Sequence, residues 1–61
     1  MKKVFALIHT TPDYVEVEVY EKKKDAMEAL KDLAGEYGMD LYTDSAEGDE
    51  NWAQVEEKII I

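Results

Sequence analysis

The chain has 61 residues, of which fifteen are Asp or Glu and seven are lysine, giving a formal net charge of −8. A surface of that sign repels phosphate groups, which excludes direct binding of nucleic acid. With no cysteine and one histidine, the sequence offers neither a disulfide nor a zinc cluster. We therefore expect one small domain over residues 1–61, with a thin core, no cofactor and no bound metal.

Two strands joined by a short reversal are predicted first. Lys3–Thr10 has a continuous apolar centre, which is typical of an inner strand. Residues 10–13 include Pro12, which lacks a ladder donor, and Asp13, whose side chain can close a turn. Tyr14–Glu21 alternates with period two and predicts a half-buried antiparallel strand. One face is expected to hold Val15, Val17 and Val19, and the other Tyr14, Glu16, Glu18 and Tyr20.

The only predicted helix spans Lys24–Tyr37. Its apolar residues recur at the spacing of one helical face: Ala26, Met27, Leu30, Leu33, Ala34 and Tyr37. Gly38 follows directly and predicts a left-handed helix end. The start has no Ser, Thr, Asn or Asp to cap it, and lysines occupy the first turn.

The remainder predicts two further strands. Met39–Asp44 alternates and indicates a short strand, Ser45–Asn51 is a polar loop, and Trp52–Ile61 is the closing strand. The inward face of the closing strand is expected to hold Ala53, Val55, Ile59 and Ile61. Glu57 interrupts that face, so either a bulge shifts the register or this carboxylate lies near an edge, where it reaches water.

This order predicts an α+β fold, ββαββ, with a mainly antiparallel four-stranded sheet and the helix on one face. The candidates for the uncovered face are Phe5, Leu7, Tyr14, Tyr20, Trp52 and Ile60. An apolar face of this kind would suit a homodimer or a protein partner.

The sequence contains no recognisable catalytic or metal-binding motif. His9 could pair with Ser45, Thr10 or Thr11 as a nucleophile, but nothing in the sequence supplies the fixed geometry of a catalytic triad. It is therefore interpreted as a surface histidine at a strand end. The acidic stretch from Asp44 does not match a calcium loop, since Ala46 and Gly48 occupy its third and fifth positions. We therefore expect a protein that is not an enzyme. The apolar run Val4–Ile8 is too short for a signal peptide or a membrane span, which favours the cytoplasm.

The acids are unevenly distributed along the chain. Residues 1–24 hold five lysines and four acids, whereas residues 25–61 hold two lysines and eleven acids. Such a surface would attract a basic partner through long-range electrostatics. The alternative is that the charge only keeps a small protein soluble. If the charge is functional, the expected partner-binding residues are Glu16, Glu18, Asp44, Glu47, Asp49, Glu50, Glu56 and Glu57.

Three segments of the first half of the chain form a recognisable pattern: the opening Met1–Ile8, then Val19–Tyr20, then Lys24–Leu30. In these segments the chain resembles a broad set of small phage and prophage proteins. The chain departs from the pattern at the helix entry, where such proteins often have a serine cap and this one has Glu21 and lysines. The resemblance implies a phage context, in which tiny acidic proteins are often inhibitors of host defence, including anti-CRISPR proteins and other DNA mimics.

Two functional hypotheses follow. The first is a non-catalytic inhibitor that mimics DNA and binds a basic nucleic-acid-binding host protein, such as a CRISPR effector subunit, in the host cytoplasm. The alternative is a small dimeric structural or accessory module that uses its open sheet face.

Overall fold

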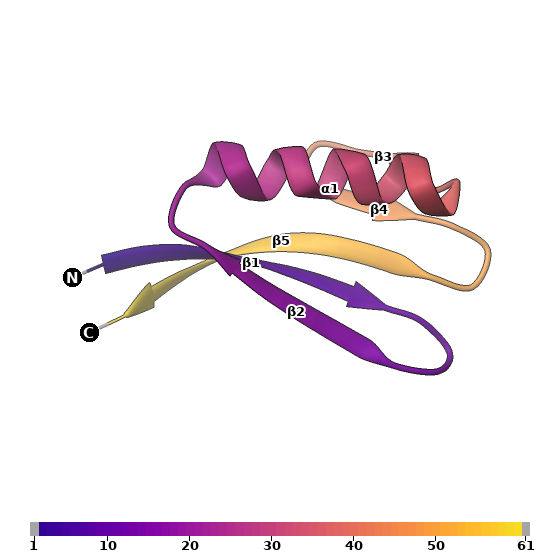
Figure 1. Ribbon diagram of the computed structural model, residues 1–61, viewed down its shortest axis with the longest axis horizontal. Helices are drawn as coiled ribbons and strands as arrows, with labels where there is room; N and C mark the ends of the chain where they lie inside the picture. The colour runs from indigo at the N-terminus through magenta and orange to yellow at the C-terminus, as the bar shows by residue number, and fades with distance from the viewer. Residues whose placement is uncertain (1, 61) are drawn as a thin grey trace.

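The computed structural model describes residues 2–60 and contains one helix lying along one face of an antiparallel sheet (Figure 1). The elements are β1 (Lys2–Thr10), β2 (Val15–Tyr20), α1 (Lys23–Tyr37), β3 (Asp40–Leu41), β4 (Ser45–Glu47) and β5 (Trp52–Ile60). The sheet order is β2-β1-β5-β4-β3. The predicted α+β class is confirmed, but the sheet has five strands rather than four.

β1 is an inner strand, as its continuous apolar run predicted. It pairs with β2 on one side and with β5 on the other, so that Leu7 lies opposite both Glu18 and Val55. Leu7 points towards α1 and is buried, while Val4 and Ala6 are nearly buried on the opposite face. Both faces of this strand therefore need apolar residues, which explains why the run does not alternate.

The reversal between β1 and β2 is held by Thr11, and not by the side chain of Asp13 as the sequence suggested. The Thr11 hydroxyl oxygen accepts the backbone N–H of Asp13 at 3.2 Å and that of Tyr14 at 3.0 Å. The Thr11 backbone N–H donates to the Tyr14 carbonyl at 2.9 Å. A hydroxyl that bonds backbone groups two and three residues ahead is a common way to close such a turn.

α1 begins one residue earlier than expected and ends at the predicted residue. Lys22, at the N-cap, makes no side-chain capping hydrogen bond, in agreement with the weak start signal. Gly38 ends the helix in the left-handed conformation at φ 67°, and the Met39 N–H donates to the Ala34 carbonyl at 2.8 Å. This turn sends Met39 back into the core, where it is buried.

The β3–β4 hairpin is the main departure from the predicted order. The expected strand Met39–Asp44 is reduced to β3, and the expected loop Ser45–Asn51 contains β4. The Tyr42 N–H donates to the Ser45 carbonyl at 2.7 Å and closes the hairpin turn. Ala46 is only 1% exposed, although polar residues surround it in the sequence. One alanine among polar residues gives no periodic signal, so the strand was missed.

β5 pairs with β1 in one unbroken register, from Lys2 opposite Ile60 to Thr10 opposite Trp52. No bulge therefore interrupts it at Glu57, and the expectation that this carboxylate reaches water is the correct one: its side chain is 52% exposed. Ile61, expected on the inward face, lies outside the described residues.

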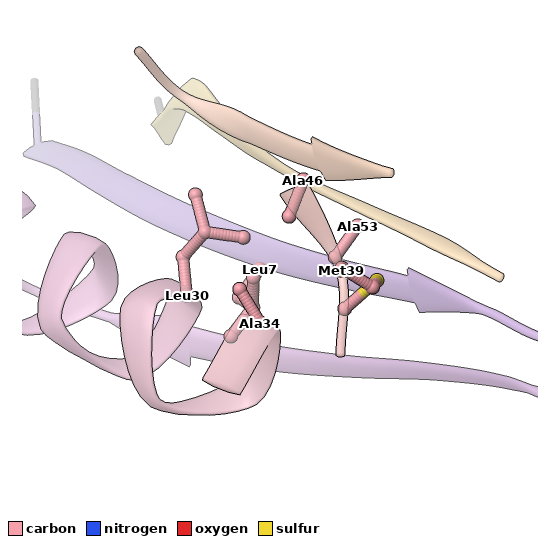
Figure 2. Close-up of a cluster of buried hydrophobic side chains, with 6 residues drawn as sticks. All are labelled: Leu7, Leu30, Ala34, Met39, Ala46 and Ala53. Carbon is pink, nitrogen blue, oxygen red and sulfur yellow. The ribbon is translucent and has the colours of Figure 1, made fainter. Parts of the chain in front are cut away.

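The core lies between α1 and the centre of the sheet and is built largely from small side chains. Figure 2 shows its members: Leu7, Leu30, Ala34, Met39, Ala46 and Ala53. Leu30 is the largest side chain that is fully buried. Ala46 and Ala53 lie opposite each other on β4 and β5. We infer that these small residues allow the helix to approach closely, at the cost of a core with little apolar volume.

The uncovered face of the sheet differs from the prediction. Leu7 lies beneath the helix, and its strand neighbour Phe5 shares that side, as do Tyr14 and Tyr20. Trp52 and Ile60 do lie on the open face, where they are about half exposed. The residues that dominate that face beside β1 are instead Val15, Val17 and Val19 of β2, which are 61%, 58% and 63% exposed.

Among residues 2–60, no helix is both long enough and apolar enough to cross a membrane.

Candidate partner-binding surface

The lysines gather at one end of the molecule. β1 and α1 begin there, while β2 and β5 end there (Figure 1). Six of the seven lysines lie at this lysine end: Lys2, Lys3, Lys22, Lys23, Lys24 and Lys58. The seventh, Lys31, is exposed near the middle of α1.

Three ion pairs of the described residues all lie at the lysine end. Lys2 Nζ is 2.8 Å from Glu21 Oε1, and this contact lowers the pKa of the Glu21 carboxyl group. The other two pairs join Lys58 to Glu56 at 2.9 Å and Lys3 to Glu57 at 3.8 Å. All six side chains are substantially exposed, so each pair contributes little to stability. Their main effect is to neutralise local acids.

A groove runs between α1 and the edge strand β2. It encloses about 230 Å³ and is lined by carboxylates from both sides. β2 contributes Glu16 and Glu18, which share a face because they are two residues apart on a strand. α1 contributes Asp32 and Glu36, which share a face because they are four residues apart on a helix. We call this the α1–β2 groove; its floor is formed by Leu7, His9, Ala29 and Leu33.

His9 lines the groove and is buried, contrary to the expected surface position. It is 4% exposed, and its Nε2 atom has no hydrogen-bond partner among the described residues. The ring of Tyr37 packs edge-on against it at a centroid distance of 4.7 Å, and that of Tyr14 at 6.3 Å. Sequence reasoning missed this because a histidine at a strand end is usually exposed, whereas the last turn of α1 covers this one.

Two tyrosine hydroxyls tie the groove walls together. The hydroxyls of Tyr14, just before β2, and Tyr37, the last residue of α1, are 3.4 Å apart. This hydrogen bond, with smaller contributions from desolvation and from nearby acids, raises the pKa of Tyr14 to about 12. The Tyr20 hydroxyl donates to Glu18 Oε2 at 2.7 Å, and that bond raises the pKa of Tyr20. One wall carboxylate is therefore held in a defined position.

A second acidic depression includes Tyr37, the residue that follows Glu36 of the groove. It encloses about 720 Å³ between the end of α1 and the loop that joins β4 to β5. We call it the loop hollow, and its residues are Tyr37, Gly38, Asp40, Tyr42, Glu47, Gly48, Asp49, Glu50 and Asn51. Four of these are acids and none is a lysine. The Gly48 N–H donates to the Asn51 carbonyl at 2.7 Å and closes the loop.

The expected partner-binding residues separate into four groups. Glu16 and Glu18 line the groove, while Glu47, Asp49 and Glu50 line the hollow. Asp44 is exposed in the β3–β4 turn and lines neither depression.

Glu56 and Glu57 do not join this surface. They lie in the second half of β5 and pair with lysines, so the structure does not bring them together with the other acids.

Three further acids belong to the surface but were not among the expected residues. Asp32 and Glu36 of α1 line the groove, and Asp40 of β3 lines the hollow. The i, i+4 spacing of the first two was a usable signal, because it places both on one helix face. The sequence does not show that this helix face lies beside β2, because that depends on the tertiary structure.

Comparison of the chain with protein-family models, with curated proteins and with solved structures gave no match.

Proposed function

We propose that this chain is a non-catalytic inhibitor that binds a basic, nucleic-acid-handling protein and occupies the surface where that protein would hold DNA or RNA. The observation that carries the proposal is the segregation of charge. The α1–β2 groove and the loop hollow together present eight carboxylates, and no lysine is among the residues that line them. Among the described residues, the ion pairs involve the lysine end alone.

The physical basis is mutual reinforcement of neighbouring charges. At physiological ionic strength, exposed charges influence one another over about 8 Å. Acids grouped in adjoining depressions therefore build a stronger local potential than the same acids dispersed among lysines. A protein that binds nucleic acid carries lysines and arginines arranged for phosphates. Such a surface complements clustered carboxylates and speeds encounter with them.

The partner class follows from this charge and from the phage-type resemblance of the first half of the chain. A host defence protein that handles nucleic acid, such as a CRISPR effector subunit, has the required basic channel. The proposed location is accordingly the host cytoplasm, and the proposed role requires neither a cofactor nor direct contact with nucleic acid.

The test is a pull-down from host lysate at low and at high salt, with elution by duplex DNA. A DNA-competitive partner is expected at low salt and should be largely lost at high salt. Neutralising four acids at the hollow and its neighbouring turn (Asp44→Asn, Glu47→Gln, Asp49→Asn, Glu50→Gln) should weaken binding to this partner by about tenfold or more.

The matched control neutralises four acids elsewhere (Glu21→Gln, Asp25→Asn, Glu28→Gln, Glu57→Gln). It carries the same net charge as the first variant. Its binding should remain within about twofold of the unchanged chain, because these acids lie outside both depressions. Equal loss in the two variants would show that net charge, and not the acidic surface, governs binding.

A second candidate function is supported by the open sheet face. Val15, Val17 and Val19 form an exposed aliphatic row on an edge strand, next to the half-buried Ile8 of β1. Exposed rows of this kind favour association. A dimeric accessory module predicts an apparent mass of two chains that persists at high salt, whereas the inhibitor predicts a monomer whose heterologous binding is sensitive to salt.

A further inference from the structure

β2 is the long open edge of the sheet. It pairs with β1 on one side, and among residues 2–60 no strand pairs with its other side (Figure 1). The opposite edge is β3, which has only two residues, whereas β2 has six. Edge strands of folded proteins are commonly protected by lysine, proline or a bulge. β2 contains neither of these residues, and its pairing with β1 runs without a break.

The backbone groups that β2 turns outward belong to its valines. The Thr11 N–H donates to the Tyr14 carbonyl, which makes these two residues a hydrogen-bonded pair at the turn of the hairpin. Hydrogen-bonded and non-hydrogen-bonded pairs alternate along an antiparallel ladder. Glu16 and Glu18 therefore turn their backbone groups towards β1. The N–H and C=O groups that face the open edge are those of Val15, Val17 and Val19.

The side chains of β2 alternate in chemistry as well as in direction. The three valines lie on the open face of the sheet and are each more than half exposed. Glu16 and Glu18 lie on the helix side and are also exposed. Their neighbours on β1 are His9 and Leu7, and not lysines. An added strand that matches this edge therefore has apolar side chains opposite the valines and basic side chains opposite the glutamates.

A second copy of β2 fits this edge poorly. When two identical strands pair antiparallel about a twofold axis, residues that share a face lie opposite each other. A register centred on Val17 places Glu16 opposite Glu18 of the other copy, and one centred on Glu18 places the two copies of Glu18 together. Like charges directly opposite each other destabilise a sheet. The glutamates therefore disfavour self-pairing and favour a strand that carries cations.

We propose that the β2 edge binds one extended segment of the basic partner as an additional antiparallel strand, in which apolar and basic residues alternate. Backbone hydrogen bonds to the three valines give the affinity, and the alternating side chains give the selectivity. The antiparallel orientation matches every other strand pair of this sheet. β1 already holds β2 in an extended conformation, so the edge loses little entropy when the segment binds.

This inference rests on the proposed function, because the same basic partner supplies the segment. The two can nevertheless fail separately. Pairing at the β2 edge is measured with a synthetic peptide and needs no host protein, whereas the DNA-competed pull-down is measured with variants of the loop hollow. A DNA-competed partner without peptide binding would reject the edge alone. Peptide binding without such a partner would reject the proposed function alone.

The probe is a short peptide in which lysine alternates with valine, acetylated and amidated at its ends and added to the isotope-labelled chain at neutral pH. Amide hydrogen exchange, followed by nuclear magnetic resonance, is the readout. Exchange at Val15, Val17 and Val19 should slow by about tenfold or more in the complex. The Glu16 and Glu18 N–H groups already bond β1, so their exchange should slow by less than about threefold.

Backbone methylation of the peptide separates strand pairing from charge attraction. In an antiparallel complex the peptide valines lie opposite those of β2 and turn their N–H groups towards it, while the peptide lysines turn theirs away. Methylation of the valine nitrogens should therefore weaken binding by about tenfold or more, and methylation of the lysine nitrogens by less than about threefold. The two methylated peptides carry the same charge.

Val17→Pro tests the edge from the side of the chain. Proline removes the N–H that faces the open edge, and edge strands tolerate it at such positions. The fold should be kept, and peptide binding should weaken by about tenfold. Val17→Thr keeps the N–H and is the control, with binding expected within about twofold. The folded state of Val17→Pro is checked first from its amide spectrum, and the methylated peptides keep the proposal testable if this variant unfolds.

Charge-matched variants locate the cation-binding side of the edge. Glu16→Gln with Glu18→Gln should weaken peptide binding by about fivefold, whereas Asp49→Asn with Glu50→Gln should change it by less than about twofold. Equal weakening by the two pairs would overturn the proposal, because it would mean diffuse attraction to the whole acidic surface. Equal binding of the two methylated peptides would also overturn it, because charge alone would then hold the peptide.

Discussion

The two faces of the sheet use their side chains in opposite ways. Beneath α1, the sheet presents the buried Leu7, Ala46 and Ala53, with Tyr20 and Val55 half-buried beside them. On the open face, β2 presents three valines that are each more than half exposed. The glutamates of β2 share the helix side but line a groove at the margin of the helix. Alternation along a strand therefore indicates which residues share a face, whereas the position of the helix decides which of the two faces is covered.

The largest expected difference between the faces is in stability. Leu30→Ala removes the largest fully buried side chain and should lower the free energy of unfolding by about 2–5 kcal/mol. A domain of this size has little stability in reserve, so the variant should be mostly unfolded. Urea unfolding followed by circular dichroism measures the change. A loss below about 1 kcal/mol would mean that the core is not where the fold places it.

A larger side chain on the helix-covered face tests how closely α1 packs against the sheet. Ala53 is fully buried opposite Ala46, so Ala53→Leu has no space and should cost about 1–3 kcal/mol of unfolding free energy. The matched control is Ser45→Ala on β4, which is half-buried and faces away from the helix, and should change stability by less than about 0.5 kcal/mol. A stabilised Ala53→Leu variant would reveal unfilled volume beneath α1.

Parts of this architecture were accessible from the sequence because they depend on local chemistry. The apolar spacing predicted the start of the helix to within one residue. Gly38 predicted its end, since the left-handed conformation there favours glycine. The inner position of β1 followed from its unbroken apolar run. The alternation along β5 predicted which of its residues face the core, and the unbroken register confirmed this for Ala53 and Val55.

Other parts were not accessible because they depend on which elements meet. The valines of β2 looked like core residues, but β2 is an edge strand and the helix covers the other side. His9 is buried only because the last turn of α1 reaches it. The acidic surface was predicted in part: its loop acids followed from composition, whereas the contribution of Asp32 and Glu36 required the helix to lie beside β2.

A smaller effect is expected on the open face. Val17→Thr keeps the side-chain shape and changes a residue that is 58% exposed, so the unfolding free energy should change by less than about 0.5 kcal/mol. The measurement is urea unfolding at low and high protein concentration. A loss above about 1.5 kcal/mol that appears only at high concentration would indicate that a second copy covers this face, in favour of the dimeric module.

The smallest expected effect concerns the contact between β2 and the end of α1. Tyr37→Phe removes the hydroxyl that bonds Tyr14, so the pKa of Tyr14 should fall from about 12 towards its ordinary value of 10.0. Because the folded-state pKa lies above the ordinary one, the stabilisation that this bond provides is present below pH 10 and is lost as the pH rises towards 12. Alkaline titration of labelled tyrosine rings by nuclear magnetic resonance measures the shift.

Tyr42→Phe, which alters an exposed tyrosine in the hairpin turn, is the control and should leave the Tyr14 titration unchanged. If Tyr14 already titrates near 10 in the unaltered chain, the hydroxyl contact between Tyr14 and Tyr37 is not formed in solution.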